Sequence, residues 1–487
     1  MVSTNKNTGE LDDANENSGG IVDAINNAKS QKFHYKTWLI SGLGFFTDAY
    51  DLFIIGIVSS LIIFAGWSKL STLETSLLDS TALLSAVLGA LLFGRLLDKL
   101  GRKAIYGLEL VLLVTGALGS AFLTPFNGIY VLIAWRFLLG VGIGGDYATS
   151  SVIMSEYSNT KSRGKFVGMV FSMQSLGLLA GPLITLAFLF GHVSPWITWR
   201  ALLAIGAIPA AIVIYYRRKM PETPKYTIRV KGDEKKAASN LQSYAGITIT
   251  STGKDDAKVR RLSWIQILTD WRLLGLVVGT AGSWFLMDWA LYGNSIMSSQ
   301  MTSALVPSTI TGIAHLIRST EYSALIFGVA AFPGYWIATF TIDRIGRKTI
   351  QLTGFSMMAL SFGLLALFPQ LLAAAYVVQF LILYGISYFF IEFGPNVTTF
   401  IYPPEVFPVT ARGTGSGMAA AGGKTGAFIG TFLDVFILAL HNGEILLFGI
   451  LAILAILGFI VTLVLLPEPK RKSLEESSNE SRYLVAH

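Results

Sequence analysis

Long runs of apolar residues, separated by short polar connections, recur along almost the whole chain. A helix that crosses a lipid bilayer needs about 20 mostly apolar residues, and twelve runs of this kind can be placed. They lie at 37–66, 76–97, 104–124, 127–153, 166–190, 199–216, 272–298, 322–342, 349–369, 372–401, 413–440 and 445–466. The pattern predicts an all-α polytopic membrane protein with twelve transmembrane helices in two six-helix bundles.

Polar segments divide the chain into five parts. The one long polar interruption, 218–270, separates two bundles that we place at 36–217 and 271–467. The N-terminal segment 1–35 is rich in Asn, Ser and Gly, and it lacks the apolar core that a signal peptide needs. We therefore expect 1–35 and 468–487 to be disordered tails that flank the bundles.

Lysine and arginine indicate which connections share one side of the membrane. They cluster at 95–103, 161–165, 217–219 and 344–348, whereas the alternate connections carry few. The positive-inside rule then places these clusters, the central loop and both tails in the cytoplasm. The net charge of +7 is spread over these clusters, so it does not indicate a nucleic-acid partner. We expect a multi-pass protein of the plasma membrane, with the lipid bilayer as its surroundings.

The two predicted bundles repeat a local pattern of charges. The segment 98–103 (DKLGRK) follows the second apolar run, and the segment 343–348 (DRIGRK) follows the eighth. A glutamate also precedes an Arg-Gly pair by seven positions in each half, at Glu156 with Arg163 and at Glu405 with Arg412. Orienting charges in a plain turn would explain one copy but not two in register. Parallel repeats of six helices, with the substrate site between them, are typical of one large class of transporters.

Several ionisable residues fall inside apolar runs, where they cost several kcal/mol and usually line a pathway. Those that we single out as candidates are Asp48, Asp51, Arg136, Asp146, Asp288 and Lys424. For Arg136, the simplest interpretation is a structural cation that pairs with a carboxylate such as Asp48 or Asp146. For Asp51, a position near a wetted helix end is the alternative to a role in transport.

The seventh run carries the clearest group of polar side chains. Trp284, Asp288 and Tyr292 are spaced four residues apart, which places them on one helix face. An aromatic stripe alone usually indicates packing, but an apolar core would not hold the carboxylate at low cost. Other hydrogen-bonding side chains inside apolar runs are Tyr147, Gln174 and Asn396.

These motifs resemble a known family. The segments 44–53 (GFFTDAYDLF), 144–147 (GGDY), 284–288 (WFLMD) and 393–396 (FGPN) are similar to signatures of the phosphate–proton symporters. The segment 94–103 resembles the hallmark loop of the major facilitator superfamily, to which that family belongs. The resemblance extends from about residue 36 to residue 467 and implies the major facilitator fold.

The resemblance also implies roles for individual residues. The phosphate site would be lined by Tyr147, Gln174, Trp284, Asp288, Tyr292 and Asn396, with Lys424 close to it. Proton movement would involve Asp48 and Asp146, and we group Asp51 and Arg136 with them as candidate proton-coupling residues. The cytoplasmic charge network that gates transport would comprise Asp98, Arg102, Glu156, Arg163, Asp343, Arg347, Glu405 and Arg412.

We therefore expect a secondary transporter that imports inorganic phosphate with protons by alternating access and functions as a monomer. The alternatives are a proton-coupled carrier of a sugar, an organic acid, sulfate or arsenate, and a phosphate sensor on the same fold. An enzyme is disfavoured, because the chain has no cysteine, no histidine cluster and no soluble catalytic domain. We expect neither a cofactor nor a metal. The glycines at 140, 142 and 145 match a nucleotide-binding spacing but lack the preceding strand.

Overall fold

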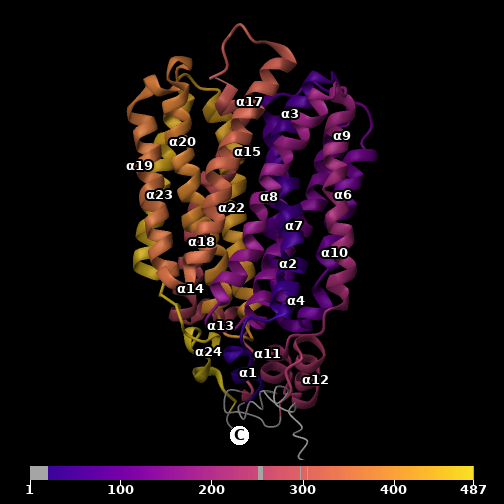
Figure 1. Ribbon diagram of the computed structural model, residues 1–487, viewed down its shortest axis with the longest axis vertical. Coiled ribbons are helices and arrows are strands. Elements are labelled where there is room, and N and C mark those ends of the chain that lie inside the picture. The colour runs from indigo at the N-terminus through magenta and orange to yellow at the C-terminus, as the bar shows by residue number, and fades with distance from the viewer. Residues whose placement is uncertain (1–19, 250–255, 297, 304, 486–487) are drawn as a thin grey trace, which may run out of the picture.

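The computed structural model describes residues 20–249, 256–296, 298–303 and 305–485. Within these ranges the chain is almost entirely helical, and most helices lie along the long axis of the molecule (Figure 1). Eleven helical segments are each long and apolar enough to cross a membrane, and a pair of helices bent by 40° provides a twelfth. The prediction of an all-α protein with twelve spans is confirmed, with its first span broken by a bend.

The first bundle starts with the bent pair α2 (Lys32–Phe53) and α3 (Ile55–Phe64). Its other spans are α4 (Thr72–Leu100), α5 (Arg102–Ile105) with α6 (Leu108–Phe122), α7 (Ile129–Tyr157), α8 (Arg163–Phe190), and α9 (Pro195–Ile205) with α10 (Ala207–Lys219). Local chemistry sets several boundaries. Ser71 and Glu74 form a capping box before α4, and Pro195 at the first position of α9 suits a helix start.

The second bundle contains three spans interrupted by π-helical segments. These are α14 (Trp271–Asp288) with η3 (Trp289–Gly293) and α15 (Asn294–Ile296), then α17 (Gly312–Ile326) with η4 (Phe327–Ala331) and α18 (Phe332–Ile345), and α20 (Val377–Ile391) with η7 (Glu392–Asn396) and α21 (Val397–Val406). The continuous spans are α19 (Arg347–Leu367), α22 (Arg412–Leu438) and α23 (Gly443–Leu465), and the connections hold α16 (Ser298–Ser303), η5 (Pro369–Leu372) and η6 (Ala374–Tyr376). Single π turns inside helices occur frequently at functional sites.

The internal repeat is visible in the backbone. Gly101 ends α4 with φ of 101°, and Gly346 ends α18 with φ of 110°. A residue with a Cβ rarely adopts a positive φ of this size, so glycine suits both positions. The arginine that follows each glycine, Arg102 or Arg347, is buried. The two halves therefore share the same sharp turn.

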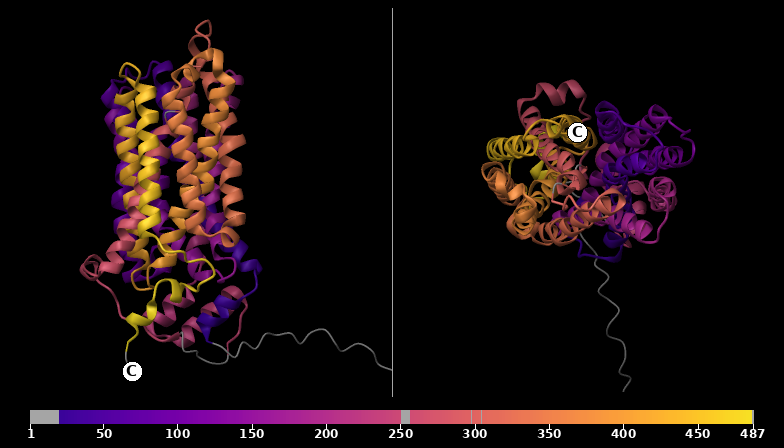
Figure 2. Two further views of the ribbon diagram at one scale, coloured as in Figure 1. Left: turned by 90° about the vertical axis from the view of Figure 1, so that its left-hand side faces the viewer. Right: turned by 90° about the horizontal axis from the view of Figure 1, so that it is seen from above.

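The two bundles lie side by side, with the N-terminal helices on one side and the C-terminal helices on the other (Figure 2). Small residues let α4 and α22 approach closely across the interface. A Cβ added to Gly94 would lie 2.6 Å from the carbonyl oxygen of Gly413, and one on Gly417 would lie 2.4 Å from that of Ala90. Such glycines permit tight helix crossings.

Short helices cover one end of the bundles, which we call the terminus-bearing end (Figure 1). They are α1 (Ile21–Asn27), α11 (Pro224–Tyr226), η1 (Thr227–Lys231), α12 (Glu234–Ala245), α13 (Trp264–Thr269), α24 (Leu474–Ser477) and η8 (Glu480–Tyr483). Disordered tails were expected at 1–35 and 468–487; residues 1–19 and 486–487 of these tails lie outside the described residues, and the described parts include the helices α1 and α24, both with buried side chains. Burial holds α1 in place: Ile21, Val22 and Ile25 pack against Ile228 and Leu241 of the central segment.

Candidate functional site

The side chains of Trp284, Asp288 and Tyr292 meet near the interface between the bundles. The Trp284 indole nitrogen donates to Asp288 Oδ1 at 3.1 Å. Lys424, on α22, donates to Asp288 Oδ2 at 3.0 Å and to the Tyr292 hydroxyl at 2.7 Å. The spacing on one helix face therefore brings a carboxylate and a phenol to the same lysine.

Polar side chains of the first bundle complete this cluster. The hydroxyl groups of Tyr147 and Tyr292 are 2.9 Å apart and join the two bundles. Gln174 donates its amide to Tyr147. On the other side of Gln174, its Oε1 accepts a hydrogen bond from Tyr335 at 3.3 Å, and Asn396 donates to the same Tyr335 hydroxyl at 2.7 Å.

All seven predicted substrate-site residues thus belong to one connected group of hydrogen bonds and charges. Each of them is at most 2% exposed. We call this group the central cluster, and it consists of Tyr147, Gln174, Trp284, Asp288, Tyr292, Tyr335, Asn396 and Lys424. Tyr335 was not predicted, because a single tyrosine in an apolar run gives no sequence signal.

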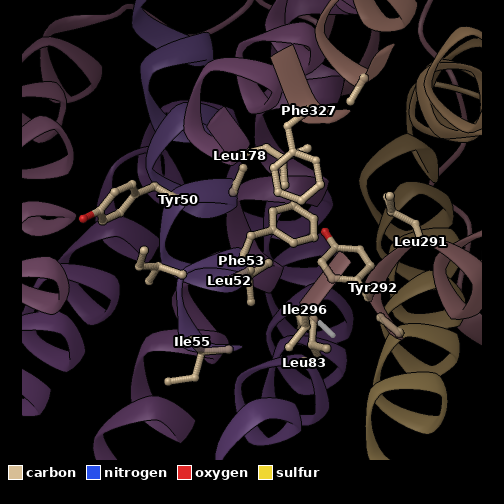
Figure 3. Packing of buried hydrophobic residues seen from close by; sticks show 14 of the residues in the cluster. Tyr50, Leu52, Phe53, Ile55, Leu83, Leu178, Leu291, Tyr292, Ile296 and Phe327 are labelled. Carbon is tan, nitrogen blue, oxygen red and sulfur yellow. The ribbon is translucent and has the colours of Figure 1, made fainter. Parts of the chain in front are cut away.

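Aromatic rings surround the central cluster. The ring of Phe53 stacks on Tyr292 with centroids 4.9 Å apart (Figure 3). Lys424 Nζ lies 4.0 Å from the ring centroid of Tyr147 and 4.1 Å from that of Tyr292. The lysine is therefore held between two phenol faces, which attract a cation.

A second buried group contains Asp48 and Asp146. Both oxygens of Asp146 accept from Arg217 at 2.8 Å, and Arg217 also donates to Glu109 at 2.9 Å. Asp48 is fully buried, and in the described ranges neither of its oxygens has a hydrogen-bond partner. It lies within electrostatic range of both Asp146 and Lys424. Asp48 is thus a carboxyl without a bonded cation between this group and the central cluster.

Two arginines in this region have partners that the sequence did not indicate. Arg136 bonds to neither Asp48 nor Asp146: its Nη2 donates to the backbone carbonyl of Asp51 at 2.8 Å. Its charge faces the carboxylates of Asp51 and Asp79 instead. Arg217 was assigned to a basic connection, yet it is fully buried and is the actual partner of Asp146. A long side chain at a helix end can reach inward, which charge counting along the sequence does not reveal.

The predicted charge network at the terminus-bearing end forms two separate groups. In the first, Glu156 accepts from Arg102 at 2.6 Å and from Arg412 at 3.2 Å. Asp98 accepts backbone N–H bonds from Gly413 at 3.0 Å and from Thr414 at 2.7 Å. Asp98 therefore caps the first turn of α22 in the opposite bundle, where the helix dipole favours a negative charge.

The second group repeats this arrangement with the bundles exchanged. Glu405 accepts from Arg347 at 2.7 Å and from Arg163 at 2.8 Å. Asp343 accepts backbone N–H bonds from Gly164 at 3.1 Å and from Lys165 at 2.8 Å, at the start of α8. All eight predicted residues take part in these groups, and each group joins the two bundles.

The C-terminal segment adds contacts that the sequence did not predict. Glu480 accepts from Arg412 and pairs with Arg229, both at 2.9 Å. Glu475 pairs with Lys225 at 3.1 Å. Burial alone would raise the pKa of the Glu475 carboxyl, but the nearby charges of Lys225 and Arg412 outweigh it and lower this pKa below its ordinary value. The segment is therefore bound to the central segment and to α22.

Comparisons with known proteins agree with this architecture. The sequence profile of the family described as "Sugar (and other) transporter" matches residues 37–480. The chain is 36% identical to a probable inorganic phosphate transporter 1-12 of Oryza sativa subsp. japonica, over 95% of this chain and 94% of that protein. It is also 36% identical to inorganic phosphate transporter 1-1 of Arabidopsis thaliana, over 96% of this chain and 98% of that protein. Among solved structures, the proton:xylose symporter XylE is similar in fold, with a TM-score of 0.73 at 20% identity over 93% of this chain and 99% of that one.

Proposed function

Since this chain belongs to the Sugar (and other) transporter family and has the major facilitator fold, we propose that it imports inorganic phosphate together with protons. The observation that carries this proposal is the central cluster, in which Lys424 and the two phenols of Tyr147 and Tyr292 converge from both bundles. Relatives that match almost the whole chain are named inorganic phosphate transporters. A cation and neutral donors are the groups that bind phosphate oxygens.

Phosphate entry changes the bonds within the central cluster. The anion competes with Asp288 for Lys424, and with Tyr292 for Tyr147. If Lys424 turns toward phosphate, the Asp288 carboxylate loses its only ion pair among the described residues. A buried carboxylate without a cation costs several kcal/mol. Uptake of a proton by Asp288 relieves this cost, so anion binding and protonation favour one another.

Asp48 and Asp146 provide a route for protons beside the cluster. Asp48 lies between Lys424 and the Asp146–Arg217 pair, and it has no bonded cation among the described residues. A buried carboxylate without a bonded cation is costly, and protonation removes that cost. We propose that Asp48 exchanges protons with Asp146, while Asp51 and Arg136 stabilise the bend between α2 and α3. Arg136 donates a hydrogen bond to the Asp51 carbonyl, and its charge faces the carboxylates of Asp51 and Asp79, which supports this structural role.

The two charge groups at the terminus-bearing end act as a gate in this proposal. Each joins the bundles through buried ion pairs, so both must break before phosphate leaves at that end. The bundles would rock around the loaded cluster to expose it alternately to either side. The basic connections favour a cytoplasmic position for the terminus-bearing end, and we place the protein in the plasma membrane as a functional monomer.

Uptake into liposomes tests the proposal. Purified protein is reconstituted, and labelled phosphate is measured inside with and without an inward proton gradient. We expect accumulation only with the gradient, with competition by arsenate but not by sugars or sulfate. A Lys424→Met variant should lose uptake, and Lys69→Met, which changes an exposed lysine, should retain it. Uptake of another solute in place of phosphate would refute the substrate, and binding without uptake would indicate a sensor.

A further inference from the structure

Glu392 is a buried carboxyl beside the central cluster, and it was not among the predicted site residues. It is the first residue of the π-helical segment η7 and is fully buried within the span Val377–Val406. The helix breaks two residues later at Gly394, whose φ of −106° and ψ of −113° are not helical. Across this break, Glu392 accepts a hydrogen bond from the amide of Asn396. The carboxyl is thus directly bonded to a predicted phosphate ligand.

The groups that interact most strongly with Glu392 in the described part of the chain are neutral or acidic. The interacting groups on packed elements are Asn396 on its own segment, Tyr335 on α18, and the carboxylate of Asp288 on α14. Tyr388, one turn earlier on α20, also interacts electrostatically with the Glu392 carboxyl. Lys424 is bonded to Asp288 and Tyr292 instead. In the described part of the chain no ion pair includes Glu392, so its ionised form is costly here, and more so when a phosphate anion is present.

The hydrogen bonds of Asn396 show how Glu392 controls the site. A side-chain amide has two N–H donors. One bond of the Asn396 amide goes to Glu392, and the other goes to the Tyr335 hydroxyl at 2.7 Å. Asn396 therefore has no donor left for phosphate until one of these partners releases it. An ionised carboxylate accepts such a bond roughly twice as strongly as a neutral group, so protonation of Glu392 loosens the bond that must be released.

We propose that Glu392 is a proton-controlled positioning residue for Asn396, and that its proton is one of those carried with phosphate. This inference rests on the proposed function. On the side of entry, Glu392 takes up one proton and frees an Asn396 N–H for a phosphate oxygen. On the side of release, Glu392 gives the proton to water, recovers the Asn396 N–H and removes one donor from the anion. One proton thus moves in the same direction as one phosphate.

The test uses Glu392→Gln, which has the same shape and still accepts from Asn396 but cannot ionise. Two measurements are made in liposomes: exchange of labelled phosphate between equal concentrations, which needs no net proton movement, and accumulation driven by a pH gradient. We expect exchange to persist and accumulation to fall by about tenfold for a gradient of one pH unit, because one coupled proton is lost. Glu392→Asp, which keeps a titratable group, should keep proton-dependent accumulation.

The outcomes separate this inference from the proposed function. If wild-type protein accumulates phosphate and Glu392→Gln does so to the same ratio, Glu392 carries no coupled proton and the inference is wrong. If the wild type moves no phosphate under any gradient, the proposed function fails, and the inference fails with it. Should Glu392→Gln not fold, Asn396→Ala provides a second test. Its phosphate binding should vary less with pH than that of the wild type, and an unchanged pH dependence would overturn the inference.

Discussion

The ion pair between Arg163 and Glu405 provides a test of the proposed gate. Arg163 belongs to the first bundle and Glu405 to the second, and the Arg163 Nε donates to the glutamate at 2.8 Å in a fully buried setting. Arg347, which shares the same glutamate, lies in the same bundle as Glu405. Opening of the terminus-bearing end therefore breaks the Arg163 bond, whereas the Arg347 bond can persist.

The magnitude follows from this difference. A hydrogen bond to a charged group contributes about 1.5–3 kcal/mol, and here that contribution exists only in the closed form. Arg163→Gln should therefore raise the population that is open at this end by roughly ten- to a hundredfold, since about 1.4 kcal/mol corresponds to a factor of ten. Arg344→Gln is a matched control, because this substitution removes the same charge from an exposed residue at the same end.

Cysteine labelling provides the assay, because the chain contains no cysteine of its own. Ser416→Cys places one thiol on α22, at a position only 2% exposed in the closed structure. The rate of maleimide labelling then reports how often this end opens. We expect faster labelling when Arg163→Gln is added and no change when Arg344→Gln is added. Equal labelling rates in the two backgrounds would refute the idea that this ion pair holds the gate closed.

Three further predictions concern the cluster, the protons and the C-terminal segment. Lys424→Met should weaken phosphate binding at least tenfold, because it removes a charge-assisted donor, and an equilibrium binding assay with Lys69→Met as control checks this. An Asp48→Asn, Asp146→Asn double variant should keep phosphate exchange but lose gradient-driven accumulation; full accumulation would exclude both carboxyls from the proton route. Glu475→Gln should lower stability by about 3 kcal/mol, because it leaves the buried Lys225 unpaired, whereas the exposed Glu476→Gln should not. The folded-state pKa of Glu475 is depressed, so this difference should be constant above about pH 5 and shrink as the pH falls below about 4. Thermal unfolding in detergent over this pH range measures it, and a difference that grows in acid would contradict the pairing.

Helical periodicity was sufficient to group the candidate site residues that share one helix. Trp284, Asp288 and Tyr292 lie together as their spacing predicts, although Tyr292 falls in a π-helical segment. The two repeated motifs were equally informative, because identical spacing in both halves implies equivalent positions. In these cases the spacing of residues along a short segment is enough to predict which side chains lie together.

Contacts between segments far apart in the chain could not be predicted from the spacing of residues. Arg217 looks like any other basic residue at a span end, and only the packing of α10 shows that it reaches Asp146. Glu392 lies two residues before the pair Gly394-Pro395, which predicts a helix break but gives no sign that the carboxyl faces the cluster. The C-terminal segment is polar in sequence, yet Glu480 is fully buried because Arg412 and Arg229 both bond to it. The placements of Arg217 and Glu480 depend on partners more than 60 residues away in the chain.

The reciprocal capping by Asp98 and Asp343 has a mechanical consequence. Each aspartate holds the first turn of a helix in the other bundle, and those two helices, α22 and α8, also carry Lys424 and Gln174. At 1.5 Å per residue, Lys424 lies about 18 Å along α22 from Arg412. If α22 tilts as a rigid rod about its capped end by about 10°, the lysine moves by about 3 Å, which is the length of its bond to Asp288. In the proposed transport cycle, each of these two helices would therefore pivot at the terminus-bearing end and displace a residue of the central cluster.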